Sequence, residues 1–94
     1  MNSKPAKTTV ITSTYNKERN QNESTAFVAL GDGKVKIHKF IFTYPWGDSP
    51  NYMQDVDDIM NVLMDIYGDI EMVDYHRGDV ETHYINNPSK LFNK

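Results

Sequence analysis

Cysteine is absent from this 94-residue sequence, which excludes disulfide bonds and thiolate metal sites. No apolar run approaches the roughly 20 residues that a membrane-spanning helix requires. The first residues also lack the apolar run that opens a secretory signal. The composition therefore indicates a cytoplasmic protein without a membrane partner. We expect residues 1–94 to form a single domain around one modest hydrophobic core.

Motifs for catalysis are missing as well. The sequence contains no nucleophile elbow, no phosphate-binding loop and no Gly-rich dinucleotide motif. The segment Gly31-Asp32-Gly33 is short and has the residues of a tight hairpin turn. The sequence thus indicates neither an enzyme nor a cofactor, and it favours a protein that acts by binding.

One stretch, residues 49–68, has a strong helical period. Its apolar residues recur at the three- and four-residue spacing of one helix face, and they are Val56, Ile59, Met60, Leu63, Ile66 and Tyr67. Ser49 or Asn51 can cap the first turn, and Gly68 can end the helix. The pattern predicts an amphipathic helix over residues 51–67 that forms the core. The methionines at 53, 60, 64 and 72 are interpreted as adaptable core filling.

Three strands are predicted before the helix, at residues 8–15, 24–30 and 34–44. The first is rich in β-branched residues but poor in apolar ones, which is typical of an edge strand. Residues 16–23 contain no apolar side chain and are expected to form a mobile loop.

The second and third strands differ in their apolar pattern. Phe27 and Val28 fall on opposite faces of the second strand by simple alternation. In the third strand the apolar residues change parity, so we expect a β-bulge near His38 and Lys39. The alternative is a central strand that is covered on both faces.

Two further strands, at residues 69–76 and 79–85, are predicted after the helix, joined by a turn near Gly78. The predicted fold class is α+β, a small antiparallel sheet of about five strands in the order β-β-β-α-β-β with one amphipathic helix on one face. Residues 1–7 are expected to be a flexible arm and residues 86–94 a short tail.

Charge is distributed unevenly along the chain. Residues 1–45 have a net charge of +4, residues 46–84 have a net charge of −9, and the whole chain has −3. The leading hypothesis is a non-enzymatic protein-binding module, an inhibitor or adaptor of the type that viruses and mobile elements encode. Its acidic surface engages a basic partner or occupies a nucleic-acid-binding site. The residues predicted to bind the partner are Asp55, Asp58, Asp65, Asp69, Asp74 and Glu81.

Three alternatives remain open. The chain can form homo-oligomers through the strand at 8–15 or through Leu91 and Phe92 in the tail. A basic strand face with Lys34, Lys36 and Lys39, beside Tyr44 and Trp46, suits nucleic acid. The last strands place four potential metal ligands at alternate positions, namely Asp74, His76, Glu81 and His83, although their spacing matches no diagnostic metal motif.

Overall fold

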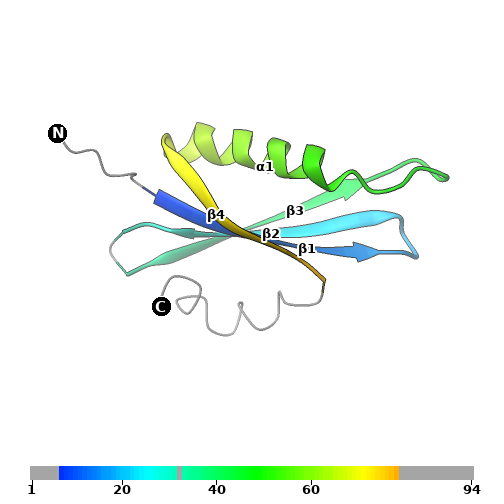
Figure 1. Cartoon of the computed structure of the whole chain (residues 1–94), viewed down its shortest axis with the longest axis horizontal. Helices are drawn as coiled ribbons and strands as arrows, with labels where there is room; N and C mark the ends of the chain where they lie inside the picture. Colours follow the sequence, from blue (N-terminus) through cyan, green and yellow to red (C-terminus); the bar gives the residue numbers. More distant parts are fainter. Residues whose placement is uncertain (1–6, 32, 79–94) are drawn as a thin grey trace.

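The computed structural model describes residues 7–31 and 33–78. These residues form strands and one helix in the order β1 (Lys7–Asn16), β2 (Gln21–Ala29), β3 (Val35–Thr43), α1 (Tyr52–Tyr67) and β4 (Ile70–Arg77) (Figure 1). The helix packs across one face of the sheet, so the predicted α+β class is confirmed. The predicted strand at 79–85 and the tail at 86–94 lie outside the described residues, as does the arm except for Lys7, which belongs to β1.

The sheet is mixed, with the strand order β3-β2-β1-β4. β1 pairs antiparallel with β2, and β2 pairs antiparallel with β3, but β4 pairs parallel with β1. The prediction of a purely antiparallel sheet is therefore wrong. The reason is that α1 carries the chain back along the sheet after β3, so that β4 starts beside Lys7 and runs in the direction of β1.

β1 is an inner strand and not the predicted edge strand. Two of its buried hydroxyl side chains, those of Thr9 and Ser13, have hydrogen-bond partners within the sheet. Thr9 Oγ1 donates to the Phe27 carbonyl oxygen at 2.9 Å, and the hydroxyls of Ser13 and Ser24 lie 2.8 Å apart. A low apolar content is thus compatible with a central position. The edges of the described sheet are β3 and β4.

The helix begins and ends where the sequence predicts. The Asn51 side chain caps its first turn by accepting a hydrogen bond from Gln54 N at 3.1 Å. At the other end, Gly68 has a φ of 81° and its N–H donates to the Met64 carbonyl oxygen. Glycine adopts this positive φ without the penalty that a side chain incurs.

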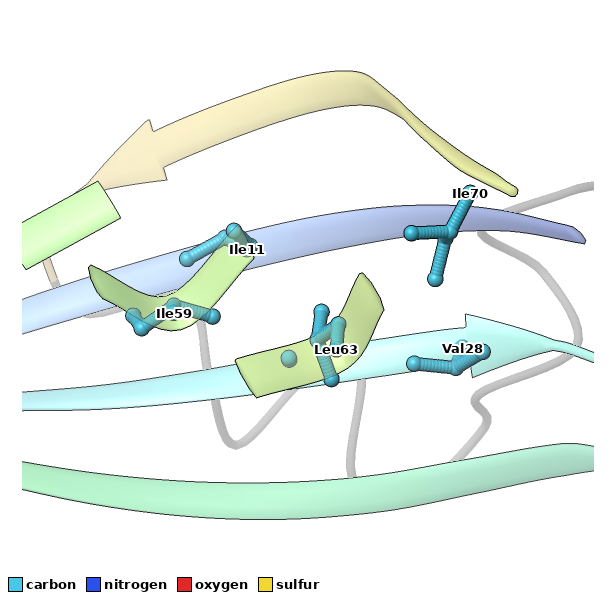
Figure 2. Close-up of a cluster of buried hydrophobic side chains, with 6 residues drawn as sticks. Ile11, Val28, Ile59, Leu63 and Ile70 are labelled. Carbon is cyan, nitrogen blue, oxygen red and sulfur yellow. The ribbon is translucent and has the colours of Figure 1, made fainter. Parts of the chain in front are cut away.

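The core lies between α1 and the face of the sheet that carries Ile11, called the helix face below. Ile59 and Leu63 from the helix are fully buried against Ile11, Ala26 and Val28 (Figure 2). Burying each such side chain stabilises the fold by about 1.5–3 kcal/mol. Ile66 was predicted for this core but is 55% exposed.

The opposite side of the sheet, called the far face, is also buried at its centre. Val10 and Phe27 are there 2% and 0% exposed. The register confirms that Phe27 and Val28 point to opposite faces, since Val28 joins the core with Ile11 whereas Phe27 pairs with Val10.

β3 pairs with β2 in an unbroken register from Val35 to Thr43, so the predicted bulge is wrong. Phe40 therefore lies on the helix face, whereas Ile37 and Ile41 lie on the far face, where they are 41% and 64% exposed. The alternative of a central strand covered on both faces is wrong as well, because β3 is an edge of the described sheet and exposes Ile37 and Ile41.

Residues 16–23 are not a long mobile loop. β1 and β2 extend into this segment and leave only a tight turn at 17–20. Asn20 has a φ of 52° and is buried, and its side-chain amide donates to the carbonyl oxygens of Tyr44 and Pro45. Hydrogen bonds therefore order a segment that contains no apolar residue.

Candidate functional site

The outer side of α1 carries three exposed carboxylates, those of Asp57, Asp58 and Asp65, called the acidic helix face below. They lie there because the apolar residues of the helix occupy the opposite side. Asp58 Oδ1 accepts a hydrogen bond from Gln54 Nε2 at 3.0 Å. Among residues 7–31 and 33–78, no Lys or Arg forms an ion pair with any of the three. Their charge is therefore not neutralised within the described chain.

Asp55, which was predicted for the same surface, is only 4% exposed. Its carboxylate accepts a hydrogen bond from Asn22 Nδ2 at 2.8 Å and another from the Tyr44 hydroxyl. The placement of Asp55 on an exposed acidic surface is therefore wrong. The residue instead ties the first turn of α1 to β2 and to the segment that follows β3.

The Tyr44 hydroxyl is affected by this contact. Burial raises the pKa of Tyr44, and the hydrogen bond and negative charge of Asp55 raise it further. Hydrogen bonds from Asn51 and Asn22 act in the opposite direction and are outweighed. Tyr44 is thus a neutral donor at physiological pH. Of Tyr44 and Trp46, the two aromatic residues predicted to stack on nucleic acid, Trp46 is the one that exposes its side chain, at 78%.

The other predicted acidic residues are separated from the acidic helix face. Asp69 is exposed directly after α1. Asp74 pairs with Val10 and Glu71 pairs with Thr8, so both carboxylates lie on the far face of β4. Glu81 lies outside the described residues. Among the described residues, the exposed carboxylates of α1 and those of β4 therefore lie on opposite sides of the sheet, and not on the single broad surface that was expected.

The four predicted metal ligands are only partly described. Asp74 Oδ2 and His76 Nε2 lie 3.1 Å apart on the far face of β4, while Glu81 and His83 lie outside the described residues. Within the described chain, no group of three or more potential metal ligands occurs. An Asp–His pair alone is too few ligands to hold a divalent ion.

The lysines of the third strand do not form one basic face. Lys36 pairs with Val28 and lies on the helix face, whereas Lys39 pairs with Thr25 and lies on the far face. Lys34 precedes the strand. The continuous register, without the bulge that was expected, is the reason for this separation. The nucleic-acid face predicted from these lysines is therefore not assembled.

Exposed apolar side chains border the acidic helix face. They are Met53, Val62, Met64 and Ile66, which are 81%, 42%, 45% and 55% exposed. The interpretation of the methionines as core filling holds for Met60, which packs against the core, but not for Met53 or Met64. The exposure of Met53 could have been predicted from the helical spacing, because position 53 is not on the same face of the helix as the buried residues at 59 and 63.

A cleft of about 610 Å³ lies between α1 and β4. It is lined by Tyr52, Met53, Val56 and Asp57 from the helix and by Met72, Tyr75 and Arg77 from the strand. The Arg77 guanidinium lies over the Tyr52 ring, 4.8 Å from its centroid. Burial raises the pKa of Tyr75. The cleft places flexible, polarisable methionine side chains directly beside Asp57 of the acidic helix face.

Comparisons with known proteins add no assignment, since no protein-family model, curated protein or solved structure matches this chain. Among the described helices, none is long and apolar enough to cross a membrane.

Proposed function

We propose that this protein is a non-enzymatic binding module that engages a basic partner protein through the acidic helix face and the cleft beside it. The observation that carries the proposal is the combination on α1 of carboxylates that form no ion pair with the described lysines and arginines and of apolar side chains that are exposed. Charges on a rim steer association, and apolar contacts supply most of the affinity once the partners meet. We further propose that the module acts in the cytoplasm as an inhibitor or adaptor.

The position of these charges along the helix supports a role beyond stability. A helix C-terminus carries partial negative charge, so an acidic side chain there is unfavourable by about 0.3–1 kcal/mol. Asp65 is in the last turns of α1, Asp69 follows its end, and no basic residue occurs in the last turn. Because these carboxylates oppose the helix dipole, helix stability does not explain their position, and a role in binding does.

A nucleic-acid-binding protein is one class of partner that suits this surface. Duplex DNA presents one charge per about 1.7 Å of its axis, and a row of fixed carboxylates can occupy the site that binds it. The helix is a rigid support for such a row. The outward carboxylates of Asp58 and Asp65 are seven positions apart, which places them about two turns from one another on the same side.

The test is capture of a partner with the intact chain from a lysate of the source organism, at about 0.05 M and about 0.5 M NaCl. The variant Asp58→Asn with Asp65→Asn removes two charges from the acidic helix face. The matched control, Glu18→Gln with Asp48→Asn, removes two exposed charges elsewhere. We expect a basic protein that is retained at low salt, released at high salt, lost with the helix variant and kept with the control.

The purified partner then gives a quantitative measure. We expect the helix variant to associate about tenfold more slowly than the control, since charge steering acts mainly on the association rate. If duplex DNA competes with this chain for the partner, the chain occupies the partner's nucleic-acid-binding site. If DNA does not compete, the chain binds another basic surface of the partner. Equal binding by the helix variant and the control contradicts the proposal.

A further inference from the structure

The two edges of the described sheet carry opposite charges. β3 contains Lys36 and Lys39 and no acidic residue, and Lys34 directly precedes it. β4 contains Glu71 and Asp74, with Asp69 directly before it and Arg77 at its end. The basic first half of the sequence thus supplies one edge of the described sheet, and the acidic second half supplies the other edge.

Both edges are available in the part of the chain that the structure describes. No described strand pairs with the outer side of β3 or with the outer side of β4. Residues 71–74 are all exposed, and so are Ile37 and Ile41 of β3. β3 has an unbroken register and exposed apolar side chains, so it is a template for pairing with another strand. β4 provides the second edge, and its register with β1 shifts once, between Thr9 and Val10.

The directions of the strands make the edges of two copies compatible. β3 runs antiparallel to β2, β2 runs antiparallel to β1, and β4 runs parallel to β1. β3 and β4 therefore point the same way. If a second copy is placed beside the first in the same orientation, β4 of one copy meets β3 of the next as a parallel pair, with α1 of both copies on the same face.

The charges also match on one face of such a pair. Lys39 lies on the far face of β3, and Glu71 and Asp74 lie on the far face of β4. Opposite charges on neighbouring strands stabilise a sheet, whereas like charges destabilise it. Pairing of β3 with β3 brings lysines together, and pairing of β4 with β4 brings carboxylates together.

We propose that copies of this chain associate edge to edge, with the acidic strand β4 of one copy pairing with the basic strand β3 of the next. The interface is heterologous, so each added copy leaves one basic and one acidic edge open. Assembly therefore grows with concentration and does not stop at a dimer. Because it depends on charge, it weakens as salt screens the edges. This inference is independent of the partner proposed above.

Sedimentation velocity tests the proposal on the full chain, from micromolar to millimolar concentration, at low and high salt. We expect the average mass to rise with concentration at low salt and to fall to that of one chain at high salt. Lys36→Glu with Lys39→Glu makes both edges acidic, and Glu71→Lys with Asp74→Lys makes both edges basic. Each of these variants alone is expected to remain a single chain.

The variant that carries all four substitutions has its edge charges exchanged, and we expect it to assemble again. Matched controls change charge equally at exposed sites away from the edges, with Lys17→Glu and Arg19→Glu for the first variant and Glu18→Lys and Asp48→Lys for the second. Circular dichroism confirms that each variant is folded. A parent chain that stays single at low salt overturns the proposal. So does a folded four-substitution variant that fails to assemble, or a control that loses assembly to the same degree.

Discussion

At the scale of single residues, Asp55 links elements that are distant in the sequence. Its carboxylate accepts hydrogen bonds from Asn22 on β2 and from Tyr44 after β3. The substitution Asp55→Ala removes the acceptor of the buried Asn22 amide and of the half-buried Tyr44 hydroxyl, and each such loss costs about 1–3 kcal/mol. We expect the free energy of unfolding to fall by about 3 kcal/mol, measured by urea denaturation.

The matched control is Asp58→Ala, which removes an exposed carboxylate from the same helix. Its effect on the free energy of unfolding should be about 0.5 kcal/mol or less. Similar losses for the two variants would contradict the structural role assigned to Asp55.

The raised pKa of Tyr44 predicts a dependence of stability on high pH. Burial is the main cause, followed by the hydrogen bond to Asp55 and its charge. The unfolded chain releases this proton near pH 10, whereas the folded chain still holds it there. The stabilisation is therefore complete below about pH 10 and is lost as the pH rises above it.

The measurement is the urea midpoint between about pH 8 and about pH 11, for the parent chain and for Tyr44→Phe. The substitution also removes a hydrogen bond, which lowers stability by a constant amount at all of these pH values. The informative quantity is the slope, which should be shallower for Tyr44→Phe. Equal slopes would show that Tyr44 does not titrate differently in the folded state.

At the scale of elements, the helix depends on a narrow buried row. Leu63 is fully buried, whereas Ile66, three residues later, is 55% exposed. Leu63→Ala should lower the free energy of unfolding by about 2–5 kcal/mol because it leaves a cavity. Ile66→Ala, the matched control, should lower it by about 0.5 kcal/mol or less. Thermal or urea denaturation distinguishes these outcomes, and a large loss at Ile66 would place that residue in the core.

Much of this secondary structure could be predicted from local signals. Asn51 and Gly68 mark the helix ends, and the alternation around Phe27 sets the faces of β2. The direction of β4 could not be predicted, since a strand has the same alternation whether its neighbour is parallel or antiparallel. The inner position of β1 depends on hydrogen bonds of Thr9 and Ser13, and the ordered conformation of residues 16–23 depends on those of Asn20. A pattern of hydrophobic residues does not reveal such hydrogen bonds.

The candidate site could be predicted only in part. Asp58 and Asp65 are exposed on the helix as the pattern indicates. Asp55 sits at the border of the apolar row, and only its distant partners show that it is buried. Asp74 and the acidic helix face lie on opposite sides of the sheet because β4 pairs with β1 in this register. Local sequence patterns do not determine that pairing.

At the scale of the whole molecule, separated charges predict an unusual response to salt. The described residues after position 46 carry many carboxylates and one base, Arg77. Their mutual repulsion destabilises the folded state and is screened as the Debye length falls from about 30 Å at 0.01 M salt to about 3 Å at 1 M. We expect the free energy of unfolding to rise with NaCl over this range.

The same measurement on Asp58→Asn with Asp65→Asn should show a smaller rise, because part of the repulsion has been removed. Dilute chain is needed so that self-association does not contribute. A free energy of unfolding that falls with salt would show that favourable ion pairs outweigh the repulsion.

Parallel pairing of β1 with β4 also dictates the order in which a nascent chain can fold. The ribosome makes β1 and β2 first, and they can form a hairpin at once, but the remaining partner of β1 follows only after α1 has been made. Throughout that interval Ile11 has neither its helix nor its second neighbouring strand. Long-range pairing of this kind is slow and leaves apolar surface open to aggregation. We therefore expect a holding chaperone, or rapid translation through residues 52–77, to raise the yield of native protein in the cell.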